Sequence, residues 1–347
     1  MATTFAVPDG RVAMAATLYT GTGATLAVSN AVNTVSFQPD FVWMKGRSGA
    51  TDHALYDSVR GTTLDLVSNS TAAETTQTTG LTTFGAAGFT VGALAKVNTS
   101  AATYIGWNWK AGGTAVSNTA GTIPSSVSAN TTAGFSVVTY TGTGANATVG
   151  HGLGVAPAMI FSKSRNNGSA DAGFWDVYHV GLTSAAYFLK LNTTDTQILA
   201  ATVWNSTAPT STVYSIGSAS GTNSGSAATY VAYCWAPVAG YSAFGSYTGN
   251  GSADGPFIYT GFRPRFIMVK SSSAVENWYV WDSSRDAYNV ESAQLYPNLA
   301  NAEASAVSID ANSNGFKCRS ATVVNTSAAT YIYAAFAENP LKYANAR

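Results

Sequence analysis

Val97-Asn-Thr-Ser-Ala-Ala-Thr-Tyr-Ile105 is a nine-residue stretch that occurs again, unchanged, at residues 324–332 of this 347-residue chain. A shorter version lies between the two, where Ser226-Ala-Ala-Thr-Tyr230 is followed by Val231. Self-similarity of this kind is the signature of a duplicated structural unit and has to be found before single segments are interpreted. The sequence therefore predicts three copies of one module.

Other short motifs occur in the same order in every copy. One is Pro-x-apolar-x-Lys, in which 'apolar' stands for three consecutive apolar residues (Pro39 to Lys45, Pro157 to Lys163, Pro264 to Lys270). The others are Tyr-Thr-Gly-x-Gly (Tyr19 to Gly23, Tyr140 to Gly144, Tyr247 to Gly251) and an Asp that follows an apolar run (Asp57, Asp176, Asp282). A common order of unrelated motifs is what a shared fold requires, and chance does not explain it.

These motifs divide the chain into five segments. We expect an N-terminal extension at 1–11, repeat 1 at 12–111, a linker at 112–133, repeat 2 at 134–238 and repeat 3 at 239–347. The segment 112–133 carries no charge and few large side chains, a composition typical of a flexible linker.

The motifs themselves have the pattern of β-strands. In Tyr104-Ile-Gly-Trp-Asn-Trp109, the residues Ile105, Trp107 and Trp109 fall on one face and the intervening residues on the other. Such alternation, rich in aromatic and branched residues and bounded by Gly, Asn, Ser and Thr, is the strand signal. No long stretch shows the helical spacing of apolar residues. The predicted fold is all-β, with three tandem antiparallel β-sandwich, jelly-roll-like modules.

Composition excludes several classes of protein. Charged residues are 10% of the chain, against about 25% in an average soluble protein. Lys+Arg and Asp+Glu both number 17, so no excess of positive charge is available to neutralise a nucleic acid. No long uncharged apolar run predicts membrane insertion, and no signal segment is expected. The two cysteines, Cys234 and Cys318, are interpreted as free, small hydrophobic residues.

The recurring acids do not form a catalytic set. Asp57, Asp176 and Asp282 are followed three residues later by Arg60, His179 and Arg285. A polar site repeated three times is one interpretation, and an Asp that hydrogen-bonds the turn after its strand is the favoured one. No second carboxylate recurs beside the first, as glycoside hydrolysis would need. The sequence therefore predicts no enzyme.

Histidines and glycine-rich loops give no cofactor site. His53, His151 and His179 lack metal-ligand spacing and are expected at the surface or in turns. The loop Gly150-His-Gly-Leu-Gly154 precedes a strand rather than a helix, so it lacks the helix N-terminus that binds phosphate. We expect no metal and no cofactor.

Tryptophans fall into two groups. Five of them lie at repeated motifs and are predicted to pack in cores: Trp107, Trp109, Trp175, Trp235 and Trp281. Trp204 and Trp278 lie off the closest matches, and we expect them to contact a surface glycan by stacking.

Three longer stretches are similar to a known family. They are Gln38-Pro-Asp-Phe-Val-Trp-Met-Lys-Gly-Arg-Ser-Gly49 with Asp57-Ser-Val-Arg-Gly61, Ala147-Thr-Val-Gly-His-Gly-Leu-Gly154, and Gly245-Ser-Tyr-Thr-Gly-Asn-Gly-Ser-Ala-Asp-Gly255 with Ala337-Glu-Asn-Pro340. Together they resemble a repeated domain of unassigned function in tail-fibre-like virion proteins of marine and cyanobacterial tailed phages. The resemblance covers nearly the whole chain and implies a virion protein assembled in the host cytoplasm. It implies no active site.

Two functions follow as expectations. The first is a tail-fibre or adhesin-type component that contacts the host surface. The alternative is a head decoration or other capsid-attached structural protein without a receptor role. The expected partners are other virion proteins, sister chains of a homo-oligomer such as a trimer, and a host surface glycan, with neither nucleic acid nor membrane among them.

The N-terminal extension is the expected docking segment. Phe5, Val7 and Pro8 make it short, apolar and extended, which suits the addition of a strand to a partner's sheet edge. The alternative is that residues 1–11 pair with repeat 1 as an edge strand.

Overall fold

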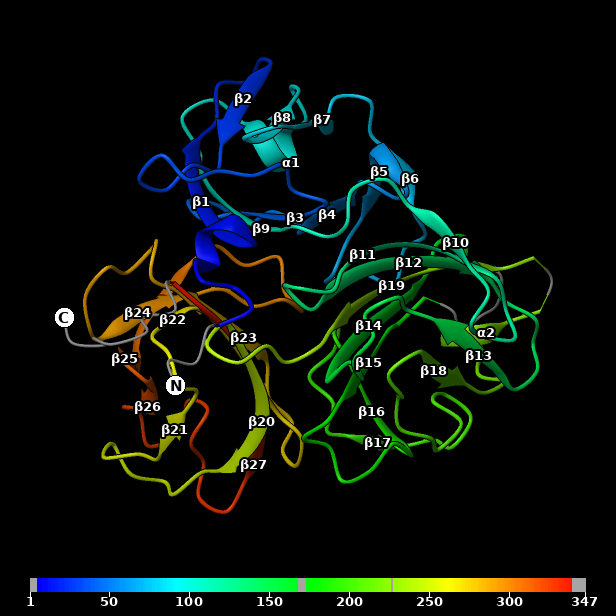
Figure 1. Ribbon diagram of the computed structural model, residues 1–347. Coiled ribbons are helices and arrows are strands. Elements are labelled where there is room, and N and C mark those ends of the chain that lie inside the picture. Colours follow the sequence, from blue (N-terminus) through cyan, green and yellow to red (C-terminus); the bar gives the residue numbers. More distant parts are fainter. Residues whose placement is uncertain (1–4, 168–172, 226, 339–347) are drawn as a thin grey trace.

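Antiparallel strands make up almost all of the regular structure. The computed structural model describes residues 5–167, 173–225 and 227–338. One short 3-10 turn, η1, and two four-residue helices, α1 and α2, are the exceptions in these ranges. No helix in this part of the chain has the length and apolarity needed to cross a membrane. The prediction of an all-β chain with antiparallel sheets is confirmed (Figure 1).

The elements of the first repeat are η1 (Gly10–Val12), β1 (Met14–Thr20), β2 (Leu26–Ser29), β3 (Phe41–Gly46), β4 (Ala54–Asp57), β5 (Gly61–Leu66), β6 (Thr75–Thr76), β7 (Leu81–Gly85), β8 (Gly88–Val91), α1 (Ala95–Asn98) and β9 (Thr103–Trp109). Next come β10 (Val116–Asn118), β11 (Ser125–Asn130), β12 (Phe135–Thr141), β13 (Ala147–Gly150), β14 (Met159–Ser164), β15 (Trp175–His179), β16 (Tyr187–Lys190), β17 (Ile198–Leu199), β18 (Val213–Ile216), α2 (Ser220–Asn223) and β19 (Thr229–Trp235). The last elements are β20 (Ser242–Thr248), β21 (Phe257–Tyr259), β22 (Pro264–Ser271), β23 (Trp278–Asp282), β24 (Glu291–Gln294), β25 (Ala304–Asn312), β26 (Gly315–Cys318) and β27 (Thr330–Ala337).

One four-strand order occurs in each of the three larger sheets. It is β1-β9-β3-β4 in repeat 1, β12-β19-β14-β15 in repeat 2 and β20-β27-β22-β23 in repeat 3, and we call these the central sheets. Smaller sheets lie beside them: β2-β8-β7, β13-β18 and β21-β26-β25-β24. The last strand of each repeat, which carries the repeated Tyr, is therefore always an inner strand of its central sheet.

A pair of stacked tyrosines fixes the register between the first and last strands of each repeat. Tyr19 is paired with Tyr104, Tyr140 with Tyr230 and Tyr247 with Tyr331. The ring centroids are 5.1, 5.0 and 5.2 Å apart, and the rings are within 16° of parallel. Cross-strand aromatic pairs are among the stronger determinants of sheet register, so the repeated Tyr motifs are explained by the fold.

A buried Asn explains the rest of the repeated nonapeptide. The Asn98 side-chain oxygen accepts from the Thr22 backbone N–H at 2.7 Å, and its amide donates to the Ala24 carbonyl just after the Gly23 turn and to the Gly92 carbonyl after β8. Asn223 and Asn325 make the corresponding bonds in the other repeats. All three are completely buried. The Asn thus clamps the Tyr-Thr-Gly-x-Gly turn, and this turn needs glycine because Gly23 has a φ of +72°.

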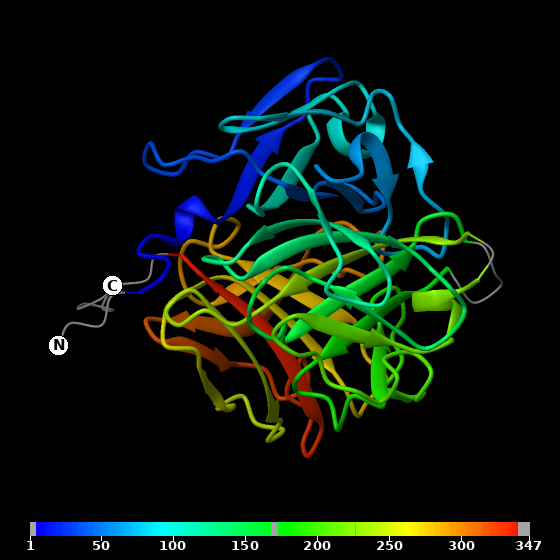
Figure 2. The same ribbon diagram turned by 45° about the vertical axis from the view of Figure 1, so that its right-hand side comes forward.

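The second face of each central sheet packs against the other repeats rather than against solvent. Trp109 lies at the centre, with its ring centroid 6.0 Å from that of Trp235 and 5.7 Å from that of Phe336. These three residues occupy equivalent positions in the last strands. One cluster of buried residues therefore draws on all three repeats, and the three lobes surround it (Figures 1 and 2).

The Trp residues at repeated motifs are buried, as predicted, but the core they share differs from the one expected. Trp107, Trp109 and Trp235 were expected inside separate sandwiches, and they lie instead between repeats. Separate clusters inside repeat 1 and repeat 2 fill the space between each central sheet and its smaller sheet. Whether one repeat forms a module that folds alone stays a prediction.

The expectation of a flexible linker at 112–133 is wrong. Strand β11 pairs along its whole length with β12, from Ser125 opposite Tyr140 to Asn130 opposite Phe135, and β10 pairs with β11. Val127 is buried in the core of repeat 2. Ser125 and Ser128 of β11 are buried along with Val127, so small uncharged residues here belong to a sheet rather than to a flexible linker.

Repeat 2 expressed alone tests the shared core. A fragment of residues 112–238 would expose Phe135, Phe161 and Trp235, each of which contributes about 1.5–3 kcal/mol when buried. We expect the fragment to aggregate or to bind a hydrophobic dye, whereas the whole chain remains soluble. A monomeric fragment with a single cooperative unfolding transition would contradict the shared core.

Candidate functional site

Buried polar side chains gather where the repeats meet, and the three lysines of the Pro-x-apolar-x-Lys motif are the first example. Lys45, Lys163 and Lys270 are completely buried near the ends of equivalent strands. Burial lowers the pKa of each ammonium group to about 8. Each Nζ donates to a carbonyl of its own repeat and to one carbonyl of another repeat; the latter are those of Ala300, Thr71 and Thr194 respectively. Repeat 1 thus bonds repeat 3, repeat 2 bonds repeat 1, and repeat 3 bonds repeat 2.

An ion network closes the junction between repeats 1 and 2. Asp57 accepts from Arg60, which also bonds Glu74 at 2.7 Å, and Glu74 pairs with Arg165 of repeat 2 at 2.8 Å. The Tyr233 hydroxyl, also from repeat 2, donates to Asp57 at 2.8 Å. Burial raises the pKa of Glu74, but the hydrogen bond from Arg165 and the charge of Arg60 outweigh it and hold that pKa below its usual range.

The junction between repeats 3 and 1 has the same design with different residues. Asp282 accepts from Arg285, Arg285 bonds Glu303 at 3.1 Å, and Glu303 pairs with Arg47 of repeat 1 at 2.8 Å. Trp107 of repeat 1 donates its indole N–H to Asp282 at 3.0 Å. In this junction Trp107 takes the part that Tyr233 takes between repeats 1 and 2.

The third junction has uncharged groups where the other two have ion pairs. The backbone N–H of Gln197 donates to the Ser272 carbonyl at 2.8 Å, as Glu74 N–H does to Arg165 and Glu303 N–H to Arg47. His179 of repeat 2 bonds the Tyr333 carbonyl of repeat 3 at 3.0 Å. The polar groups at this junction are therefore uncharged at positions where the other two carry ion pairs.

Strand register corrects the predicted equivalence of the three acids. Asp57 is opposite Phe41 and Asp282 is opposite Phe266, but the equivalent Met159 is opposite His179. His179, not Asp176, therefore occupies the position of Asp57 and Asp282. Both of those carboxylates also accept backbone N–H groups of the following turn, as the favoured interpretation expected.

The expectation of surface histidines is wrong, because His53, His151 and His179 are all buried, while His53 and His151 do lie in connections between strands. In each ring Nδ1 accepts a hydrogen bond, from Trp43 Nε1, Leu153 N and Gly181 N respectively. Each Nε2 therefore carries the proton and donates to a backbone carbonyl. Burial lowers the pKa to about 3 for His53 and about 4 for His179, so these rings are neutral structural ties.

Trp204 and Trp278 are not available to a surface glycan, because each has only 1% of its surface exposed. Trp204 lies in the core of repeat 2 between Tyr178 and Tyr214. Trp278 lies between repeats, and its indole N–H donates to the Lys190 carbonyl of repeat 2 at 2.9 Å. Both positions are explained by packing.

The N-terminal extension packs onto this same chain where it is described. Val7 is buried in the shared core, and the half-buried Phe5 ring lies so close to Gly240 that a Cβ there would be 2.7 Å from it. Pro8 is exposed. None of the described residues 5–11 forms a strand, so the edge-strand alternative is wrong for them, and the buried Val7 is not free to dock elsewhere.

Cysteines, possible metal ligands and unpartnered carboxylates are the remaining candidates for chemistry in the described part of the chain. No group of three His, Cys, Asp or Glu side chains there could hold a metal ion. Cys234 and Cys318 are free and buried, as predicted, and burial raises the pKa of the Cys318 thiol to about 11. Glu291 is the exception: it is almost fully buried, and neither carboxyl oxygen has a hydrogen-bond partner among the described residues.

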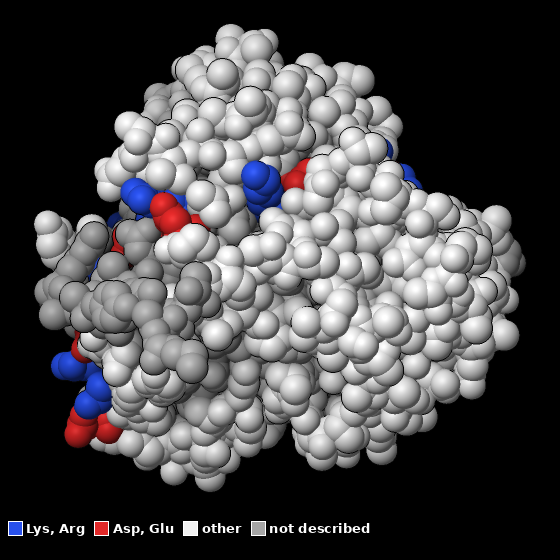
Figure 3. All heavy atoms as spheres, in the orientation of Figure 1, with Lys and Arg blue, Asp and Glu red and all other residues white. Residues whose placement is uncertain are grey.

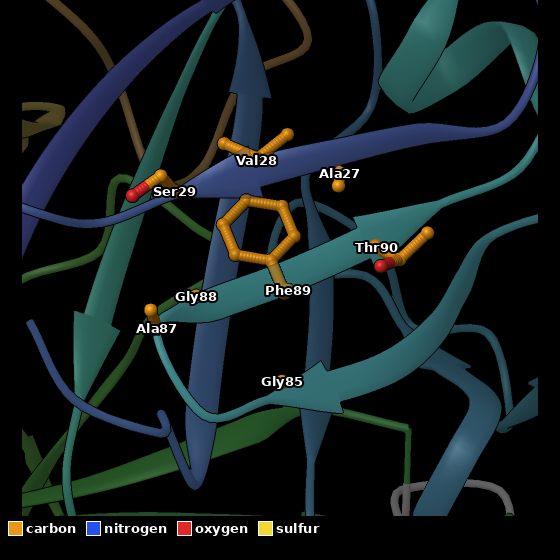
Figure 4. Close-up of a pocket in the computed structure, with 8 residues that line it drawn as sticks. All are labelled: Ala27, Val28, Ser29, Gly85, Ala87, Gly88, Phe89 and Thr90. Carbon is orange, nitrogen blue, oxygen red and sulfur yellow. The ribbon is translucent and has the colours of Figure 1, made fainter.

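Open hollows lie on the outer surface of the described residues. On the face in Figure 3 the charged side chains lie along the lobe boundaries and at one edge, and wide areas carry none. A hollow of about 280 Å³ on repeat 1 is lined by small residues of β2, β8 and the end of β7, around the Phe89 ring (Figure 4). It contains no titratable group, so it has no acid, base or nucleophile.

Repeat 3 has an exposed aromatic surface that sequence reasoning missed. Phe257 and Tyr259 lie on one face of the edge strand β21, with 46% and 69% of their surfaces exposed, while Ile258 between them points into the core. Lys317 is opposite Phe257 on β26 and forms an ion pair with Asp254. We call these four residues, Asp254, Phe257, Tyr259 and Lys317, the aromatic platform. In the sequence only the Phe-Ile-Tyr alternation indicates it, and a glycan site sought among the Trp residues does not include it.

Tyr233→Phe tests the network between repeats 1 and 2. Removing the hydroxyl leaves the buried Asp57 carboxylate without one of its donors, and we expect a loss of about 1–3 kcal/mol in the free energy of unfolding. Chemical denaturation measures it. Tyr288→Phe is the control, because Tyr288 is 86% exposed and should tolerate the change. Equal stability of the Tyr233 variant and the wild type would show that the bond contributes nothing.

Glu291→Gln tests the unpaired carboxyl. Burial raises its pKa from 4.5 to about 8, so the folded protein keeps a proton that the unfolded chain releases. This contribution to stability is fully present below pH 4.5 and is lost as pH rises to about 8. We expect the variant to match the wild type near pH 4 and to be more stable by a few kcal/mol at pH 9. Asp254→Asn, at an exposed carboxylate, is the control, and a wild-type-minus-variant difference that does not change with pH would contradict the assignment.

Comparison with protein-family models places the chain in one family. A domain of unknown function, DUF7483, matches residues 12–340. This match spans all three repeats together with the 112–133 segment, so the family unit is the whole three-lobed body. No curated protein matches the chain.

Proposed function

The chain belongs to the DUF7483 family, and for this member we propose a non-enzymatic role as a virion protein of a tailed phage, of the tail-fibre or adhesin type. It is assembled in the host cytoplasm with other virion proteins and binds a host surface glycan through repeat 3. The origin in a phage rests on the resemblance described above. The glycan rests on the aromatic platform.

The platform is the observation that carries the proposal. The Cα atoms of alternate residues in a strand are about 7 Å apart, and the faces of exposed aromatic rings can stack on the apolar faces of sugar rings. The Asp254–Lys317 pair beside them offers both an acceptor and donors to hydroxyl groups. A sugar chain needs no deep pocket for such binding.

The buried carboxylates at the junctions are engaged in structural ion pairs, which supports a role without catalysis. The carboxylates of Asp57 and Asp282, and those of Glu74 and Glu303, are each bonded to at least one arginine. Hydrogen bonds and charge from their arginines hold the pKa of Glu74 and Glu303 below the usual range, so these two carboxyl groups are poor general acids. The proposal therefore assigns these residues to holding the lobes together.

A head decoration without a receptor role is the second candidate, and the closed arrangement of lobes favours it. The lysine contacts join repeat 2 to repeat 1, repeat 3 to repeat 2 and repeat 1 to repeat 3. The described repeats therefore form a closed ring rather than a row of modules along a fibre. A cyclic body suits a threefold position on a particle surface. Electron microscopy of virions with an antibody against the chain distinguishes head from tail.

Substitution of the platform tests glycan binding. We expect the double change Phe257→Ala and Tyr259→Ala to weaken binding to host envelope polysaccharide by at least about tenfold, since each stacked ring contributes of order 1 kcal/mol. Surface-immobilised polysaccharide with purified protein gives the affinity. Tyr288→Ala, which removes another exposed ring of repeat 3, should bind as the wild type does. Undiminished binding by the double variant would rule out the platform and leave the decoration role.

A further inference from the structure

The three repeats differ in what covers the outer edge of their first strand. In repeat 2, β11 lies along the free edge of β12 with six residue pairs. The equivalent strands are β1 and β20, each at the end of its sheet order, and no described strand pairs with their outer edges. At β20 the chain around Gly181 lies close by, since a Cβ there would be 2.9 Å from the Gly245 carbonyl oxygen. The edge of β1 is the more open of the two.

A hollow of about 360 Å³ runs beside β1. It is lined by Ala16, Thr17 and Leu18 of β1, by the end of β2 and the loop after it, and by repeat 3 residues that include Arg265, Ser284 and Glu338. In repeat 2 the equivalent position, beside β12 at the junction with repeat 1, is occupied by β11. There Asp40, equivalent to Arg265, accepts from Ala111 N–H, and the next residue, Gly112, donates to Ser128 of β11.

The backbone of β1 presents its bonding groups to this hollow. The Ala16 carbonyl accepts from the Ser284 hydroxyl of repeat 3 at 2.8 Å, so it points away from β9. In a strand the N–H and C=O of one residue point to the same side, and alternate residues share that side. The N–H groups of Ala16 and Leu18 therefore face the hollow as well, ready for a strand ladder.

A buried arginine with an unused donor lies at the same place. Arg265 has 5% of its surface exposed, and its Nε has no hydrogen-bond partner among the described residues. Its terminal nitrogens bond the Ser284 hydroxyl at 3.2 Å and, at 3.4 Å, the Glu338 carboxylate. Because Ser284 bonds both Arg265 and the Ala16 carbonyl, the guanidinium is close to the residue that would lie opposite Ala16.

We propose that the edge of β1 is a docking site for an extended polypeptide segment of another protein of the particle, which adds an antiparallel strand to the central sheet of repeat 1. The segment has small side chains, as β11 has, and carries a carboxylate opposite Ala16 that pairs with Arg265. Main-chain bonds to β1 supply affinity and the carboxylate supplies register. The site is independent of the aromatic platform, so either can fail without the other.

Peptide binding to the full chain tests the proposal. The probes are a peptide of residues 123–130 (Ile-Pro-Ser-Ser-Val-Ser-Ala-Asn) and the same peptide with Ser128→Asp, because Ser128 is opposite Val137, the equivalent of Ala16. We expect both peptides to slow amide hydrogen exchange at Ala16 and Leu18. The Asp peptide should bind about tenfold more tightly, and Arg265→Met should remove that advantage.

Matched variants make the result decisive. Leu18→Pro removes one donor from the open edge without removing a bond to β9, and it should abolish binding, whereas Leu18→Ala should retain it. Unchanged exchange at Ala16 and Leu18 with millimolar peptide, or equal binding by the two Leu18 variants, would overturn the proposal. A chain ending at Glu338 is measured alongside. If the two amides are protected in the full chain and lose protection on this truncation, residues 339–347 are the occupant and a partner's strand is excluded.

Discussion

The fold depends on the need to bury both faces of each central sheet. One face is covered within the repeat by a smaller sheet. The other carries Trp109, Trp235, Phe336 and their neighbours, which no single repeat can remove from water. A two-layer sandwich normally leaves its outer faces polar. Here the second apolar face of each repeat is covered by the other two, and three such faces meeting at one centre produce a closed body rather than a string of domains.

The same requirement explains where the few charged residues are. A hydrophobic core brings surfaces together but does not fix which residue faces which. The junctions supply this through bonds with defined partners, such as the Lys163 ammonium on a repeat 1 carbonyl and the Arg165–Glu74 pair. Buried charges contribute little net stability, since their desolvation offsets their attraction, but they strongly penalise a wrong partner. The lobes are therefore held by apolar packing and aligned by buried polar bonds.

Much of the local structure could be read from the sequence. The alternation in the last strands and the burial of Trp107 and Trp109 follow from period-two patterns. The closed arrangement could not, because alternation shows that a face is apolar but not whether it meets the same repeat or another one. The strand β11 was hidden by its small residues, which resemble a linker until their pairing with β12 is known.

Register was the other limit. The motif of an Asp after an apolar run placed Asp176 with Asp57 and Asp282, but Asp176 is opposite Ser162 and His179 takes the equivalent place. A shift of this kind leaves the motif intact while it moves the side chain to the other face of the sheet. Glu74 and Glu303 could not be paired in advance for a related reason. Each meets its arginine across a junction between repeats, and no spacing along the chain encodes that contact.

A body built from near-equal repeats acquires function where the equivalence is broken. The stacked tyrosines, the buried asparagines and the lysine contacts occur in every repeat, and this uniformity makes them parts of the scaffold. The differences are few and local. Among the described residues, the junction of repeats 2 and 3 lacks the ion pairs of the other two, β11 covers one first strand of three, and β21 alone carries two exposed rings side by side. Since a partner that recognised the shared features would bind three times with similar strength, a specific contact has to use the features that occur once. The edge of β1 and the face of β21 are such features; they belong to different repeats and can be occupied at the same time.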